Sequence, residues 1–102
     1  MGSSQVIAER KFWYSKKGDS LRQELTIQIE APRPACKAGA VEFDLGTAVC
    51  TVRFIGLDNR VLDVYGADSL QAVQLAANID PSLRKLAEKY DLFFYDGEPY
   101  EE

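Results

Sequence analysis

The sequence predicts an α+β fold: an antiparallel sheet of about five strands, with a helix, kinked or split, packed on one face. Two patterns lead to this prediction. Between residues 6 and 65, short runs of alternating apolar and polar residues are separated by Gly, Pro, Asn and Asp, which is typical of β-hairpins. Residues 68–90 carry apolar residues at helical spacing instead. A chain of 102 residues is expected to form a single domain, residues 1–102.

A first hairpin is predicted from two neighbouring strands. Residues 6–14 are rich in β-branched and aromatic types, which favour strands. Residues 21–31 are predicted to form the second strand, because residues 25–30 alternate strictly between large aliphatic and polar side chains, as in an antiparallel strand with one buried face. Pro32 and Pro34 follow, and we expect them to end this strand because proline cannot donate a backbone hydrogen bond.

A second hairpin is predicted over residues 48–65. Residues 48–55 alternate clearly and place Cys50 on the apolar face, where a thiol usually serves as a small core side chain. A turn follows, and residues 60–65 are predicted to pair with residues 48–55. Residues 41–45 also alternate and predict a short edge strand before this hairpin.

The helix is predicted to begin at Asp68, whose carboxylate can accept backbone N–H groups of the first turn. Gln71, three residues later, completes a capping box. The following residues are apolar except for one narrow polar stripe, so we expect this helix to be mostly buried. Asp80 and Pro81 have the spacing of a second N-cap and first helical position, so the helix is expected to kink or restart there.

The chain is expected to end in a strand and a tail. Residues 92–95 form a short apolar run, which predicts a last strand. Residues 96–102 are acidic and polar, and chain ends of this kind are often frayed. We therefore expect a flexible acidic tail over residues 96–102.

Charge and hydropathy exclude two classes of partner. The net charge is −4, and residues 52–102 hold most of the acidic excess, which makes the chain a poor ligand for nucleic acid phosphates. No apolar run approaches the length of about 20 residues that a membrane span needs, and no signal peptide is recognisable. We expect a cytoplasmic protein that binds neither nucleic acid nor membranes. Residues 1–4 can be native or a remnant of cloning.

The residue types also limit the chemistry. Histidine is absent, which removes the commonest general base and the commonest metal ligand. The two cysteines, Cys36 and Cys50, lack the spacing of a zinc site, and whether they form a disulfide is left open. We expect no catalytic residue, no metal and no cofactor.

One short motif offers an alternative. Asp68-Ser69-Leu70 is the tripeptide on which carrier proteins mount a phosphopantetheine arm, and Ser69 would lie at a helix start that favours a phosphodiester. Carrier domains are four-helix bundles, however, whereas strand alternation precedes the motif here. A capped helix start is therefore the preferred interpretation, and a phosphopantetheine site at Ser69 is the alternative.

Two longer stretches resemble a family of short uncharacterised bacterial proteins. Residues 50–56 (Cys-Thr-Val-Arg-Phe-Ile-Gly) resemble the cysteine-containing strand of that family. Residues 65–76 begin with Tyr-Gly-Ala-Asp-Ser-Leu-Gln-Ala, which is similar to its Tyr-Gly-x-Asp-Ser-Leu-Gln-Ala helix start. The resemblance spans residues 5–80 and includes the early hairpin. It implies the same fold and a domain of unknown function, and it supplies no catalytic residues.

Adjacent aromatic residues suggest an interface. Three consecutive aromatics in one strand cannot all face the core, because side chains alternate between the two faces of a sheet. An exposed aromatic is a common anchor of a protein interface. The candidate interface residues are Phe12, Trp13, Tyr14, Phe93, Phe94 and Tyr95.

The sequence thus predicts a non-enzymatic protein-interaction module, of the immunity or accessory type, that binds a protein partner or forms a homodimer. The alternative is a carrier-like or small-ligand-binding domain that uses Ser69 or a pocket between sheet and helix.

Overall fold

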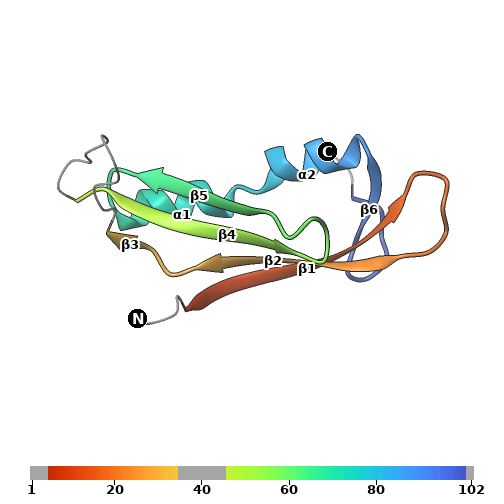
Figure 1. Cartoon of the computed structure of the whole chain (residues 1–102), viewed down its shortest axis with the longest axis horizontal. Coiled ribbons are helices and arrows are strands. Elements are labelled where there is room, and N and C mark those ends of the chain that lie inside the picture. Colours follow the sequence, from red (N-terminus) through yellow and green to blue (C-terminus); the bar gives the residue numbers. More distant parts are fainter. Residues whose placement is uncertain (1–4, 35–45, 101–102) are drawn as a thin grey trace.

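The computed structural model of the chain describes residues 5–34 and 46–100, and it confirms the α+β class (Figure 1). One antiparallel sheet is covered on one face by two short helices. In chain order the elements are β1 (Val6–Lys16), β2 (Gln23–Glu30), β3 (Arg33–Pro34), β4 (Ala48–Ile55), β5 (Val61–Gly66), α1 (Ser69–Ala77), α2 (Asp80–Ala87) and β6 (Tyr90–Phe94).

Both predicted hairpins are confirmed. β1 pairs with β2, and β4 pairs with β5, each in antiparallel register. β4 also pairs along its other edge with β2 and with the two-residue β3, and β6 pairs with β1. The described sheet therefore has six strands rather than about five. The strand expected over residues 41–45 lies outside the described residues.

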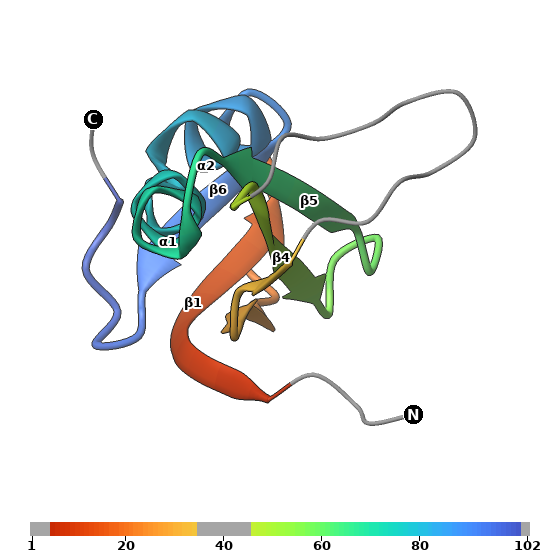
Figure 2. The ribbon, with the colours of Figure 1, turned by 90° about the vertical axis from the view of Figure 1, so that its left-hand side faces the viewer.

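The core lies between the sheet and the helices. The alternation of β2 and β4 places Leu25, Ile27 and Cys50 on the helix side of the sheet, where each is at most 2% exposed. Phe12 of β1 and Leu83 of α2 complete this cluster from either side. Figure 2 shows α1 and α2 on the same side of the sheet, as the apolar pattern of these strands requires.

The start of α1 forms as predicted. The Asp68 carboxylate accepts a hydrogen bond from the Gln71 backbone N–H at 2.8 Å. The Gln71 side chain reaches back and accepts from the Ala67 N–H at 2.6 Å, so two backbone donors of the helix start are satisfied reciprocally.

The expectation that this helix is mostly buried is wrong. Leu70 is 66% exposed and Leu75 is 49% exposed, while only Ala72 and Ala76 are buried. The reason is close contact through small side chains: a Cβ on Gly66 would lie 2.4 Å from the Ala72 backbone nitrogen. The sheet covers only the side of α1 that carries Ala72 and Ala76, and the opposite side of α1 faces outward.

The helical segment is split at Asn78, the C-cap residue of α1, as the sequence predicted. The predicted capping role of Asp80 is not observed. The N-cap of α2 is Ile79, without a side-chain cap, and the Asp80 carboxylate instead accepts a hydrogen bond from the Tyr100 hydroxyl at 3.1 Å. Pro81 lies in the first turn, where its missing N–H costs nothing.

The described part of the expected tail folds back along β6. The Phe94 N–H donates to the Glu98 carbonyl at 2.7 Å, and the Tyr100 N–H donates to the Leu92 carbonyl at 2.9 Å. Gly97, with φ of 97°, provides the turn. Residues 97–100 therefore lie along the outer edge of β6.

Two absences concern the described residues alone. No helix within residues 5–34 and 46–100 is long and apolar enough to cross a membrane. The same residues contain no cluster of three or more Cys, Asp or Glu that could hold a metal ion.

Candidate functional site

The first half of β1 has an open edge. β6 pairs only with Phe12–Lys16, so among the described residues Val6–Lys11 has β2 on one side and no strand on the other. The side chains of Val6 and Ile7 are 40% and 47% exposed. An unpaired edge presents backbone N–H and C=O groups at alternate residues, and an extended segment can add to it.

A groove of about 300 Å³ runs beside this edge on the helix side of the sheet. Ile27 and Ile29 of β2 line it from the sheet, and Ala77 and Ile79 line it from the junction of the two helices. It lies between the regions where the helices pack most closely, since α1 packs on β4 and β5 while α2 packs on β6. The remaining lining residues are Ala8, Glu9, Arg10 and Asp80.

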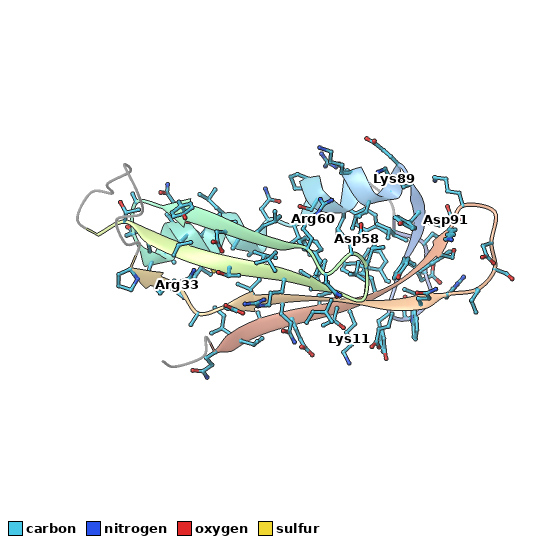
Figure 3. All side chains as sticks on the ribbon, in the orientation of Figure 1. Lys11, Arg33, Asp58, Arg60, Lys89 and Asp91 are labelled. Atoms are coloured by element: carbon cyan, nitrogen blue, oxygen red, sulfur yellow. The ribbon has the colours of Figure 1, made fainter. Side chains whose placement is uncertain are left out.

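A second, more open depression of about 490 Å³ lies where β6 ends and the open edge begins. Its lining consists of Arg10, Lys11, Phe94, Tyr95 and Asp96. Lys11 lies on the face of the sheet away from the helices (Figure 3), with its Nζ atom 5.9 Å from the centre of the Tyr95 ring. Arg10 lines both depressions, and no ion pair joins it to another described residue.

The six candidate interface aromatics divide between the two faces. Phe12 and Tyr14 are buried at 0% and 7% exposure, so they present no surface to a partner. Trp13 lies on the opposite face and stacks on Tyr95, with ring centres 5.2 Å apart and planes 8° apart. The Trp13 indole N–H also donates to the Tyr95 carbonyl at 3.1 Å.

The other two aromatics belong to β6. Phe93 is half-buried beneath the Arg22 guanidinium, which lies 3.7 Å from the ring centre. Phe94 is 37% exposed and Tyr95 is 52% exposed. These two side chains are therefore the most accessible of the predicted set, and both line the depression at the end of the open edge.

A polar network crosses β3, β4 and β5 on the face away from the helices. The Arg33 guanidinium donates to the Thr51 hydroxyl at 2.9 Å, and that hydroxyl donates to the Asp63 carboxylate at 2.8 Å. Nearby, the buried Glu30 carboxylate accepts a hydrogen bond from Arg53. Because these groups satisfy one another across neighbouring strands, the network stabilises the sheet.

The remaining sequence candidates show no reactive geometry. Ser69 is exposed at the first position of α1, and its hydroxyl forms no hydrogen bond within the described residues. Cys50 is fully buried without a disulfide, and its thiol donates to the Glu30 carbonyl at 3.1 Å. Burial, ahead of the opposing effect of Arg33, raises the pKa of this thiol and so disfavours the nucleophilic thiolate. Cys36 lies outside the described residues.

Sequence reasoning missed the open edge, and it named a pocket between sheet and helix without assigning residues to it. The available signal was a difference in strand length: a strand predicted over residues 6–14 cannot be paired along its whole length by a last strand predicted over residues 92–95. Which half stays open depends on the register between β1 and β6, and no local pattern encodes that register.

Comparison with protein families, with curated proteins and with solved structures finds no match to this chain. The resemblance of residues 5–80 to a family of short bacterial proteins stays a prediction. The candidate site is therefore defined by geometry alone.

Proposed function

We propose that the protein is a non-enzymatic interaction module that binds an extended segment of a protein partner at the open edge of β1. In this mode, called strand addition, backbone hydrogen bonds supply much of the affinity and side-chain pockets supply specificity. The observation that carries the proposal is the coincidence of an unpaired edge, Val6–Lys11, with a groove alongside it that has both apolar and charged lining residues.

The second open edge of the sheet is a useful comparison. β5 pairs only with β4 among the described strands, so its outer edge is also unpaired. Neither of the two depressions beside β1 is lined by β5 residues. An edge with an adjoining groove can hold alternate side chains of an added strand, and this favours β1 over β5.

A peptide-display selection against the protein tests this function. We expect enrichment of extended sequences, and an enriched peptide should slow backbone hydrogen exchange in Val6–Lys11 while leaving β5 unchanged. Light scattering after size-exclusion chromatography measures self-association in parallel. Protection confined to β5 or to α1 would refute this site, and a strict monomer that enriches no peptide would refute the function.

The groove also supports a second candidate function, the binding of a small apolar molecule between sheet and helices. Its volume of about 300 Å³ is at the lower end of the range for ligand pockets. A ligand that binds only the folded protein raises its melting temperature, and Ala8→Phe should abolish that rise by filling the groove. A thermal-shift screen without any hit would remove this candidate.

The carrier alternative has a direct test as well. Incubation with a phosphopantetheinyl transferase and coenzyme A, followed by intact-mass measurement, should leave the mass of the protein unchanged. A mass increase that Ser69→Ala abolishes would replace the interaction module with a carrier function.

A further inference from the structure

The open edge carries its own charge pattern. Glu9, Arg10 and Lys11 follow one another, and side chains alternate between the faces of the sheet. Arg10 pairs with Ile27 and Ala8 pairs with Ile29, so both lie on the helix side, beside the groove. Glu9 pairs with Gln28 on the opposite face and accepts a hydrogen bond from its amide at 3.1 Å.

This pattern disfavours a second copy of the chain as the added strand. In a two-fold antiparallel pairing, one residue of the edge lies opposite its own copy. Centring the pair on Glu9, Arg10 or Lys11 places like charges opposite each other, which is destabilising. Centring it on Val6, Ile7 or Ala8 places the pair on the register shift between Val6 and Ala8, where the ladder is irregular. The edge therefore favours a different chain with complementary charges.

We propose that the partner segment runs antiparallel to β1 and places a carboxylate opposite Arg10 and a large apolar side chain opposite Ala8, two residues further along. This inference rests on the proposed function. The two side chains share one face, because the side-chain period of a strand is two. The carboxylate meets a guanidinium that has no ion pair among the described residues, and the apolar side chain enters the groove between Ile29 and Ile79.

The partner residue between the carboxylate and the apolar side chain points to the other side of the sheet and lies opposite Glu9. A basic side chain at this position complements the Glu9 carboxylate. We assign the antiparallel direction because every pairing among the described strands is antiparallel and β6 already approaches this edge in that direction. The recognised pattern is thus acidic, basic, large apolar. Its acidic end lies nearest Phe94 and Tyr95, at the depression where β6 ends.

Two peptides of identical composition test the pattern. The matched peptide, fluorescein-labelled Thr-Glu-Lys-Leu-Thr-Val, places Glu opposite Arg10 and Lys opposite Glu9. The interchanged peptide, Thr-Lys-Glu-Leu-Thr-Val, reverses both contacts. By fluorescence anisotropy we expect the matched peptide to bind about tenfold more tightly, since two attractive cross-strand pairs become repulsive. Equal affinities, or no binding of either peptide at about 1 mM, would overturn the proposal.

A charge swap on the protein gives the reciprocal test. Arg10→Glu should lose the preference for the matched peptide, and the double variant Glu9→Lys with Arg10→Glu should invert it. Arg60→Glu, which makes the same change of charge in the β4–β5 connection, should keep the original preference. Melting temperatures of all variants show whether they fold, and a preference that survives the double swap would contradict the assigned register.

Backbone methylation separates this inference from the proposed function. Peptides N-methylated at odd or at even positions lose the donors of one edge each, so strand addition requires that only one of the two still binds. If both bind equally, strand addition itself is wrong. If methylation at only one of the two sets of positions abolishes binding while the charge interchange has no effect, strand addition holds and the charge pattern is wrong.

Discussion

The two halves of β1 both contain apolar residues, but these residues lie in opposite environments. In the second half, Phe12 and Tyr14 are 0% and 7% exposed; in the first half, Val6 and Ile7 are 40% and 47% exposed. Both halves pair with β2, but only the second half also pairs with β6. The difference teaches that an apolar residue of this strand is buried where a second strand also pairs with it, and that Val6 and Ile7 stay exposed without one.

The boundary between the halves is set where β6 leaves the sheet. Phe94, the last residue of β6, pairs with Phe12, and the chain then turns at Gly97 and folds back along the far edge of β6. Had β6 continued in line, it would have closed the edge that we assign to a partner. The open edge Val6–Lys11 is therefore the position that a longer β6 would have occupied.

The largest expected effect on stability comes from a substitution in the second half of β1, which β6 covers. Phe12→Ala should reduce the free energy of unfolding by about 3–5 kcal/mol, because it opens a cavity under a fully buried ring. Ile7→Ala, in the open half, should cost less than about 1 kcal/mol. Urea denaturation measures both, and similar costs would show that the two environments do not differ as described.

Two glycines, one packed against β2 and one in an open turn, allow a second comparison of a covered and an uncovered position. Gly56 and Gly18 both have positive φ, at 103° and 83°, so alanine is strained at either position. At Gly56 an added Cβ would also lie 2.4 Å from the Glu24 carbonyl oxygen, whereas nothing lies within 4 Å at Gly18. We expect a loss of about 1–2 kcal/mol for Gly18→Ala and a clearly larger loss for Gly56→Ala. Equal losses would argue against this close approach of the β4–β5 connection to β2.

The start of α1 offers a similar comparison with a smaller expected effect on stability. The Asp68 carboxylate has a hydrogen-bond partner, whereas the neighbouring Ser69 hydroxyl is exposed. Asp68→Ala removes the cap of the Gln71 N–H and should cost about 1 kcal/mol. Ser69→Ala changes an exposed hydroxyl and should stay within about 0.5 kcal/mol. Thermal unfolding compares them, and a large cost at Ser69 would point to a role that the capped helix start does not explain.

The smallest effect depends on pH. Burial, followed by the nearby Tyr90 and Asp58, raises the pKa of Tyr14 above its ordinary value of 10.0, and its hydroxyl donates to the Gly56 carbonyl at 2.5 Å. The folded state favours the neutral phenol, so this stabilisation is complete below about pH 10 and is lost as pH rises through the folded pKa.

Tyr14→Phe should therefore show a shallower loss of stability above pH 10 than the wild type. Burial also raises the pKa of Cys50 from 9.0, so wild-type stability should begin to fall above about pH 9, and Cys50→Ala should remove that earlier part. Chemical denaturation at stepped pH values measures both. Parallel curves for the wild type and Tyr14→Phe would contradict the assignment to Tyr14.

Local patterns were sufficient for the two hairpins and for the start of α1. Strict alternation around Ile27 and Cys50 predicted strands with one buried face, and both residues lie in the core. Asp68 and Gln71 predicted the helix start, and both hydrogen bonds form. These predictions succeed because alternation and capping depend on residues within one turn or one strand.

The candidate site could be predicted only in part. Tyr95 and Phe94 were proposed as interface residues and line a depression, whereas Val6, Ile7 and Arg10 were not singled out. The burial of α1 was overestimated for a related reason. A narrow polar stripe does not show whether a second layer covers the remaining helix surface, because that depends on elements distant in the chain.

By itself, then, the sequence determined the α+β class, the two hairpins, the split helix and the core face of each central strand, because each of these follows from the period of apolar residues and from turn and cap chemistry. Only the tertiary structure decided which half of β1 is covered, how α1 and α2 divide the sheet between them, and where the groove lies. These features depend on strand register and on contacts between distant segments, and neither has a local signature in the chain.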